Sequence, residues 1–208
     1  MTGPKPVALP LGEGPIFTNH STNRALCRCY TNSMTKYIWH NEAVPDNLKI
    51  KQVHAVLVTA DGRILLRIKN GAYRLTGGHP EPQDADAEAT IRREALEEAD
   101  VEVDKIDYIG YQEVNEKDGA HYAQMRMVAR VSNILSATPD PDRSGSWTYG
   151  RMLVAPDEAR RELPFGEINA PLIDNAIRIA RSNNYFTEPI NVNRELLNQE
   201  DKQSEDES

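Results

Sequence analysis

Two apolar runs of the chain, residues 53–60 and 63–68, flank the dipeptide Asp61-Gly62. Both runs are rich in β-branched and aliphatic residues, which favour extended strands. An Asp-Gly pair readily adopts positive φ angles, and a tight turn between antiparallel strands needs them. The pattern therefore predicts a β-hairpin, and with it a sheet whose apolar surface other elements must cover.

A change of pattern follows the predicted hairpin. Residues 71–78 form a short extended run that ends in a pair of glycines. A proline-containing loop comes next, and a helical pattern then begins with Asp84 or Asp86 as its candidate N-cap. The acidic first turn suits the helix dipole. This stretch predicts a strand, a loop and a helix in immediate succession.

Further strands and one more helix are predicted downstream. Residues 108–114 and 122–131 show strand patterns and are joined by the polar turn 115–119. Residues 150–155 predict a short strand, and residues 170–180 predict a helix with apolar side chains at helical spacing. This order contains hairpins rather than regular βαβ alternation. It predicts an α/β domain with a mixed sheet covered by helices, and not a doubly wound dinucleotide fold.

The chain is expected to divide into three parts. Residues 1–45 form an N-terminal arm or extension, residues 46–185 form the domain, and residues 186–208 form an acidic tail. The tail is polar, and we predict that it is disordered. Within the arm, residues 24–40 are richer in apolar and aromatic residues and fit either a helix or a pair of strands.

Composition restricts the partners and the compartment. The 208 residues carry a net charge of -8, which argues against binding to duplex nucleic acid or to an anionic membrane. No apolar run approaches the roughly 20 residues of a membrane span, and the first residues lack the apolar stretch of a signal peptide. We therefore expect a soluble, cytoplasmic protein. Cys27 and Cys29 are expected to be ordinary reduced thiols, because two cysteines supply neither a disulfide framework nor a four-ligand zinc site.

Three glutamates gather on one side of the predicted helix. At 100° per residue, Glu94, Glu97 and Glu98 share an arc of roughly 100°, so their carboxylates can converge. Arg93 lies four residues before Glu97 and can pair with it. Hard cations such as Mg²⁺ take carboxylate oxygens together with the phosphates of a substrate. The spacing by itself leaves two interpretations open, a solvated helix face and a metal site.

The whole stretch from the glycine pair to the helix resembles the Nudix box, the signature of the Nudix hydrolase family. In that signature a glycine pair ends a strand, an acidic loop follows, and a helix carries Arg-Glu-x-x-x-Glu-Glu. The matching residues are Gly77, Gly78, Arg93, Glu94, Glu97 and Glu98. The resemblance extends over residues 53–180, and the helix motif is its most specific part.

This resemblance implies a Nudix-type α/β/α sandwich with a mixed β-sheet, and a hydrolase of phosphorus-containing anhydrides. The implied substrate is a nucleoside diphosphate linked to another moiety, cleaved at its pyrophosphate bond. The implied cofactor is Mg²⁺ or Mn²⁺, bound by Glu94, Glu97 and Glu98. The carbonyl of Gly78 would assist, and Arg93 belongs to the same catalytic set. The metal would bridge the diphosphate and lower the pKa of an attacking water.

The residue that accepts the proton of this water stays open. Glu94 is one candidate. The other candidates are acids downstream of the box, namely Glu113, Glu116, Asp118 and Glu167. By pattern alone, each downstream acid is better explained as a surface charge than as a base.

Three residues are expected to contact the substrate, namely Arg74, Arg126 and Tyr111. The two arginines could bind phosphate, and the tyrosine could stack on a base, although solvation or packing explains such residues as well. The same alternatives apply to Tyr73, Trp147, His54 and His79. The resemblance also allows a homodimer in which the N-terminal segment takes part.

Three departures from the family pattern leave a competing hypothesis. The loop between Gly78 and Glu94 is one residue longer than the family spacing, and Asp84 is the nearest match for its usual glutamate. Asp100 stands where the family usually has glycine, and Thr76 stands where proline is common. The alternative is a catalytically weak or inactive Nudix-fold module that binds a nucleotide or regulates a partner.

Overall fold

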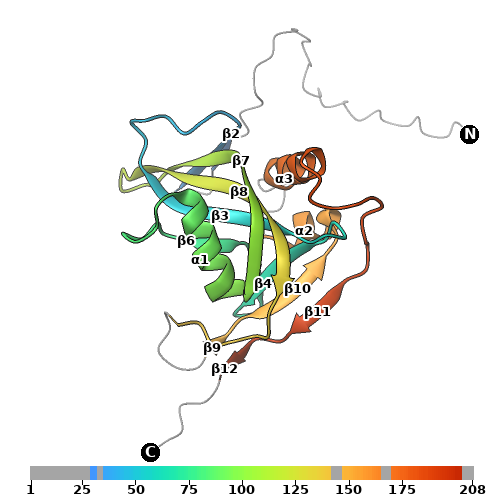
Figure 1. Ribbon diagram of the computed structural model, residues 1–208. Helices are drawn as coiled ribbons and strands as arrows, with labels where there is room; N and C mark the ends of the chain where they lie inside the picture. The colour runs from blue at the N-terminus through green and yellow to red at the C-terminus, as the bar shows by residue number, and fades with distance from the viewer. Residues whose placement is uncertain (1–28, 32–34, 142–146, 165–169, 203–208) are drawn as a thin grey trace, which may run out of the picture.

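The computed structural model describes residues 29–31, 35–141, 147–164 and 170–202 (Figure 1). Within them, one ten-stranded sheet is accompanied by three helices and a two-stranded sheet. The strands are β1 (Cys29–Thr31), β2 (Lys36–His40), β3 (Ile50–Val58), β4 (Ile64–Lys69), β5 (Ala72–Arg74), β6 (Thr76–Gly78), β7 (Val101–Asn115), β8 (His121–Ile134), β9 (Trp147–Thr148), β10 (Gly150–Val154), β11 (Glu195–Asn198) and β12 (Asp201–Lys202). The helices are α1 (Ala87–Ala99), α2 (Pro156–Glu162) and α3 (Ala170–Ser182).

The main sheet is mixed. Along it the strands follow the order β1-β2-β7-β8-β3-β4-β10-β11, while β5 pairs with β4 and β6 pairs with β3. Strands β3 and β8 run parallel, and the other pairs of the main sheet are antiparallel. The small sheet pairs β12 with β9. The predicted α/β class with a mixed sheet is confirmed.

The predicted hairpin is confirmed as well. Strands β3 and β4 pair antiparallel, with Val58 opposite Ile64 at the end next to the turn. Gly62 has a φ of 79°, and its N–H donates to the carbonyl of Thr59 at 2.9 Å. The Asp-Gly pair therefore marks the turn because glycine accepts this backbone conformation without strain.

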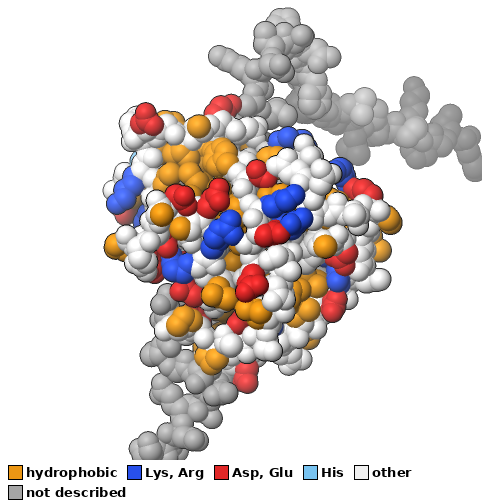
Figure 2. Space-filling model, in the orientation of Figure 1, with side chains coloured by type: hydrophobic (Ala, Val, Ile, Leu, Met, Phe, Trp, Pro, Cys, Tyr) orange, Lys and Arg blue, Asp and Glu red, His pale blue; other side chains and the backbone are white. Residues whose placement is uncertain are grey.

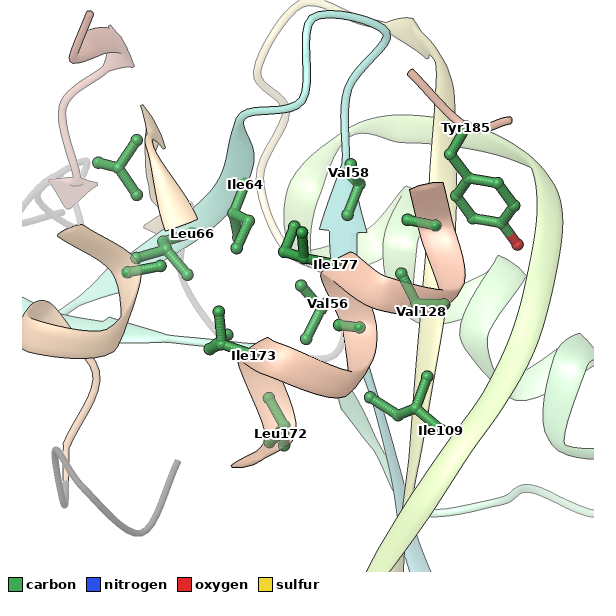
Figure 3. Close-up of a cluster of buried hydrophobic side chains, with 14 of the residues drawn as sticks. Val56, Val58, Ile64, Leu66, Ile109, Val128, Leu172, Ile173, Ile177 and Tyr185 are labelled. Atoms are coloured by element: carbon green, nitrogen blue, oxygen red, sulfur yellow. The ribbon is translucent and has the colours of Figure 1, made fainter. Parts of the chain in front are cut away.

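Helices cover both faces of the sheet, as Figure 1 shows for α1 and α3. On one face, α1 packs against β3, β6 and β7, and its buried residues Ile91, Ala95 and Ala99 belong to a core cluster to which β8 also contributes. On the other face, α2 and α3 pack on β3, β4, β8 and β10 (Figure 3). The apolar stripe predicted for the last helix is buried in full and consists of Leu172, Ile173, Ala176, Ile177 and Ala180. The result is an α/β/α sandwich.

The prediction that the tail is disordered from residue 186 is wrong for residues 195–202. Strand β11 extends the main sheet by pairing with β10, and β12 pairs with β9. The Glu200 carboxylate also accepts hydrogen bonds from the N–H groups of Asn70, at 2.7 Å, and Gly71, at 3.1 Å. The polar composition of residues 186–208 did not reveal these strands, because hydrogen bonds between main chains need no apolar side chains.

The main sheet also reaches into the predicted N-terminal arm, residues 1–45. The alternative that the sequence left open for residues 24–40 resolves as strands, since β1 pairs with β2 and β2 pairs with β7. Cys27 lies outside the described residues, and Cys29 begins β1. The sheet therefore begins before the predicted domain boundary.

The remaining elements agree with their predictions except at the boundaries. The run 71–78 divides into two short strands, β5 and β6. The strands predicted at 108–114 and 122–131 are both longer in the structure. Strand β7 begins directly after α1, and β8 pairs with it along most of its length. Strand β10 and helix α3 lie where residues 150–155 and 170–180 predict them. Across the described ranges, every helix is too short or too polar to cross a lipid bilayer.

Candidate metal and substrate site

The glycine pair lets strand β6 and helix α1 approach closely. Gly77 has a φ of 142°, and a Cβ there would overlap the backbone of Val53 and His54 in β3. A Cβ on Gly78 would instead overlap the carboxylate of Glu94. The first glycine is required by the neighbouring strand and the second by the helix. Together they place the end of β6 against the acidic face of α1.

The two ends of α1 are formed by aspartates. Asp86 is the N-cap, and its side-chain oxygen accepts a hydrogen bond from the N–H of Ala89 at 2.9 Å. Asp100 is the C-cap in the left-handed conformation, with a φ of 47° and a ψ of 49°, and its carboxylate accepts the N–H of Thr138 at 3.0 Å. Aspartate tolerates this conformation better than most residues. The replacement of the family's usual glycine at this position therefore leaves the helix end intact.

Arg93 connects the loop after the glycine pair to the helix. Its Nε and Nη2 donate to the two oxygens of Asp84, at 3.2 and 3.1 Å. Its Nη1 lies 3.0 Å from Glu94 Oε1 and 2.8 Å from Glu97 Oε2. The Arg93 hydrogen bonds lower the pKa of Asp84 to about 2, although burial acts in the opposite direction. The pairing of Arg93 with Glu97 is thus present, and Asp84 is a further partner of the same guanidinium.

Glu98 is held by a different arginine. Nη1 of Arg67, in β4, lies 2.7 Å from Glu98 Oε1, and the N–H of Gly77 donates to Glu98 Oε2 at 3.0 Å. Burial raises the pKa of Glu98 to about 7, although Arg67 and the Gly77 hydrogen bond lower it. Burial also raises the pKa of Glu94. Both carboxylates are therefore in surroundings where a cation stabilises their charged form.

The three glutamates contact two different arginines in this conformation. Glu94 and Glu97 face Arg93, whereas Glu98 faces Arg67. Among the described residues, no three acidic, histidine or cysteine side chains are grouped closely enough to hold a metal ion. The donors nevertheless fit a hard divalent cation in kind, because all are carboxylates on one helix face. Figure 2 shows acidic and basic side chains intermixed on the side of the molecule where α1 lies in Figure 1.

A pocket of about 360 Å³ adjoins this acidic face, and Arg67 belongs to both. Arg74 and Arg126, which the sequence suggested as substrate-binding residues, both line the pocket. The other lining residues are Tyr37, Gln52, His54, Leu75, Gln112, Gln124, Leu163 and Pro164. Tyr111 lies elsewhere, since its buried ring stacks on His40 with a centroid distance of 4.6 Å. Its contact with substrate stays a prediction that this placement does not favour.

The candidate bases downstream of the box are engaged in local contacts. Glu113 lies between two histidine rings, each with its Nε2 2.8 Å from one carboxylate oxygen. Glu116 accepts a hydrogen bond from a tyrosine hydroxyl at 2.6 Å, and Asp118 accepts one from a backbone N–H of its own turn at 3.0 Å. Glu167 lies outside the described residues. Their role as a general base stays a prediction.

The other sequence candidates are dispersed. His54 lines the pocket, whereas His79 is exposed and contributes only its carbonyl, which accepts a hydrogen bond from Arg93. Tyr73 is partly buried and packs against the core under α3. Trp147 begins β9 in the small sheet. The structure thus brings one of these four residues, His54, into the pocket.

Sequence reasoning missed several side chains of the site, among them the polar residues Arg67, Gln112 and Gln124. Arg67 stands inside a buried strand, and an arginine in such an apolar run was the available signal. The alternation along residues 122–131 places Gln124 on the same strand face as Arg126, so that pair was also accessible from the pattern. Gln112 carried no signal, because only the pairing of β7 with β8 brings it opposite Gln124.

Comparisons with known proteins agree with this architecture. A family model described as the NUDIX domain matches residues 49–176. The chain resembles the crystal structure of a pyrophosphohydrolase from Bacillus subtilis, with 18% identity, a TM-score of 0.54, and coverage of 70% of this chain and 92% of the other. A Nudix hydrolase from Nitrosomonas europaea is 22% identical over 66% of this chain and 93% of its own, with a TM-score of 0.44. A search of curated proteins finds no significant match.

The family match has a firmer basis than the likeness to the Bacillus subtilis structure, which at 18% identity supports the fold alone. The matched segment includes β3, the glycine pair and the whole of α1, and it reaches into α3. It spans more than half of the chain. The chain therefore belongs to the Nudix family, a family of hydrolases of phosphorus-containing anhydrides.

Proposed function

We propose that this protein is a divalent-metal-dependent pyrophosphohydrolase that cleaves a nucleoside diphosphate linked to another moiety. The observation that carries the proposal is the acidic face of α1, where Glu94 is buried against Gly78 and the partly buried Glu98 accepts a hydrogen bond from the Gly77 N–H. Arg67 joins this face to a pocket that two further arginines line. A substrate made of a diphosphate and a second moiety has one part for each of these two regions.

The metal ligands that we propose are Glu94, Glu97 and Glu98, assisted by the carbonyl of Gly78. When bound, Mg²⁺ or Mn²⁺ would neutralise charge on the diphosphate and lower the pKa of an attacking water. Arg93 lies against both Glu94 and Glu97, Arg67 lies against Glu98, and the two guanidinium groups offset the mutual repulsion of the carboxylates. Glu94 stays the candidate base on the helix itself.

The test is a hydrolysis screen with Mg²⁺ and Mn²⁺ across nucleotide sugars, dinucleotides and nucleoside triphosphates. We expect turnover of diphosphate-linked compounds, and we expect Glu98→Gln to reduce it roughly 100-fold or more. Circular dichroism and thermal unfolding should show that the variant stays folded. The matched control is Glu88→Gln, which makes the same change at an exposed residue of the same helix. Undiminished turnover by Glu98→Gln would contradict the role of this carboxylate.

The second candidate is a Nudix-fold module that binds a nucleotide without hydrolysing it. It is favoured by the contacts of the three carboxylates, each of which lies against an arginine in the described conformation. Tight nucleotide binding without turnover under either metal would support this candidate. Robust turnover would exclude it as the main function.

Assembly and location are separate proposals. We propose a cytoplasmic protein, whose net charge of -8 disfavours attachment to an anionic membrane. The family resemblance allows a homodimer. Sedimentation velocity of the full chain would distinguish a dimer from a monomer.

A further inference from the structure

The pocket contains a buried arginine without an acidic partner. Arg126 is 7% exposed, and its guanidinium contacts Gln112 Oε1 at 2.9 Å and Gln124 Oε1 at 2.6 Å. It also contacts His54 Nδ1 at 2.6 Å. Among the described residues, its Nε has no hydrogen-bond acceptor, and no carboxylate forms an ion pair with it. The positive charge of Arg126 is therefore surrounded by neutral groups.

His54 does not supply Arg126 with a negative charge. Burial, followed by the charges of Arg126 and Arg67, lowers the pKa of His54 well below its ordinary value, so the ring is neutral at pH 7 and accepts the Arg126 hydrogen bond. Burial lowers the pKa of Arg126 to about 10, which still leaves it charged at pH 7. A buried charge without a counter-ion is costly unless a ligand supplies one.

The remaining charges of the pocket have the same sign. Arg74 lines it and donates to the carbonyl of Tyr73 at 3.1 Å, whereas the charge of Arg67 is offset by Glu98. The lining residues of the described pocket include no aspartate or glutamate. Guanidinium groups in a partly enclosed cavity attract carboxylate and phosphate oxygens. The pocket thus favours an anionic ligand group.

The location of the pocket separates this anion from the diphosphate. The three glutamates of α1 do not line the pocket, and Arg67 stands between the two regions. A volume of about 360 Å³ lies within the range of small-molecule sites. A ligand whose diphosphate sits at the glutamates would reach past Arg67 and place its second moiety beside Arg126.

We infer that this pocket selects diphosphate derivatives whose second moiety carries an anionic group of its own, a carboxylate or a phosphate, bound by Arg126 with help from Arg74. The inference rests on the proposed function for the position of the diphosphate. It adds a substrate class, because compounds with a neutral second moiety leave Arg126 without a counter-ion.

Two single substitutions supply that counter-ion from within the protein. Gln112→Glu is nearly isosteric and replaces the side-chain amide, whose oxygen already accepts a hydrogen bond from Arg126, with a carboxylate. Gln124→Glu does the same from β8 and serves if the first variant fails to fold. The matched control is Asn41→Asp, which adds the same charge at an exposed residue outside the pocket lining. Its oxygen already accepts from Trp39 Nε1 at 2.8 Å.

The experiment measures binding by calorimetry in EDTA, where no metal-dependent turnover occurs. The probes are two pairs, UDP-glucose with UDP-glucuronate and NADH with NADPH, whose members differ by one carboxylate or one phosphate. We expect the more anionic member of at least one pair to bind about tenfold or more tightly to the natural protein and to Asn41→Asp. The two glutamate variants should reduce this preference to about twofold or less, and their ligand-free melting temperature should rise.

The outcomes separate this inference from the proposed function. A preference in the first pair assigns a carboxylate, and a preference in the second assigns a phosphate. Equal or undetectable binding within both pairs overturns the inference, as does a preference that both glutamate variants retain. Hydrolysis with Mg²⁺ is assayed separately. Turnover without selective binding overturns the inference and leaves the proposed function standing. Selective binding without turnover supports the anion-binding pocket and contradicts the proposed hydrolysis.

Discussion

Asp84 organises the loop that carries the extra residue of this chain. It accepts two hydrogen bonds from Arg93 and a third, at 3.0 Å, from the hydroxyl of Thr90. The same guanidinium contacts Glu94 and Glu97. One aspartate thus links the loop to the acidic face of the helix, although the lengthened loop obscured its match to the family pattern.

We expect Asp84→Asn to destabilise the protein by about 1–3 kcal/mol at pH 7, because charge-assisted hydrogen bonds to a buried carboxylate are lost. The native pKa of about 2 lies below the ordinary value of 3.8. This contribution is therefore present in full above about pH 4 and is lost as the pH falls towards 2. Urea unfolding at several pH values measures it.

The two proteins should converge in unfolding free energy as the pH falls through this window. Asp118→Asn is the matched control, since it makes the same change at an exposed turn. A difference between Asp84→Asn and the natural protein that stays constant down to pH 2 would disprove the assigned linkage.

Asp100 shows how a departure from a family pattern can be neutral for the fold. The position needs a positive φ, which explains a preference for glycine there. Aspartate meets the same need at moderate strain, and its carboxylate gains a bond to the Thr138 N–H. The competing hypothesis of an inactive module therefore draws no support from distortion at this end of α1.

At the scale of elements, the distance between β6 and α1 determines whether Glu94 can sit beside the glycine pair. Gly78→Ala would place a methyl group where the Glu94 carboxylate lies. Because a flexible side chain can move, we expect the fold to persist and Mn²⁺ affinity to fall roughly tenfold. Electron paramagnetic resonance of bound Mn²⁺ gives the affinity.

Gly77→Ala is the informative contrast for this prediction. Its methyl group would meet backbone atoms of Val53 and His54, so we expect loss of stability rather than a selective loss of metal binding. If Gly78→Ala binds Mn²⁺ as tightly as the natural protein, Glu94 is not a ligand.

Strand β11 protects the edge of the main sheet. It pairs with β10, and the ion pair of Arg63 with Glu195, at 2.7 Å, attaches its beginning to the residue before β4. We expect a chain that ends at Arg194 to expose the amides of β10, which should exchange hydrogen at least about tenfold faster. Hydrogen exchange read by mass spectrometry measures this. The amides of β7 serve as the internal control, and unchanged exchange in β10 would contradict the pairing.

At the scale of the whole molecule, the core cluster that includes α3 and the proposed metal ligands on α1 lie on opposite faces of the sheet. Ile173 is a fully buried residue of α3, whereas the glutamates of the site lie on α1. We expect Ile173→Ala to lower the unfolding free energy by about 2–5 kcal/mol through the cavity that it leaves. Affinity for Mn²⁺ at a temperature where the variant is folded should stay unchanged.

The control for this prediction is Ile134→Ala, because Ile134 is 39% exposed and its loss leaves no closed cavity. Chemical denaturation and Mn²⁺ titration on both variants provide the comparison. A parallel loss of stability and of metal affinity in Ile173→Ala would show that the two faces are coupled.

Local features of the chain were predictable from the sequence alone. The hairpin around Gly62, an N-cap at Asp84 or Asp86 and the buried stripe of α3 follow from turn chemistry, capping and periodicity, which act over a few residues. The acidic face of α1 and its glycine pair were also visible, because their spacing along one helix is a property of the sequence.

Only the tertiary structure decided which side chains meet across the sheet. Arg67 reaches Glu98 because β4 and α1 pack around β3, and His54 lies opposite Arg126 because β3 and β8 pair in parallel. Strand β11 joins the sheet through its main chain, which leaves no mark in a polar sequence. Such contacts depend on the packing of the whole chain, whereas sequence patterns report only the conformations of near neighbours.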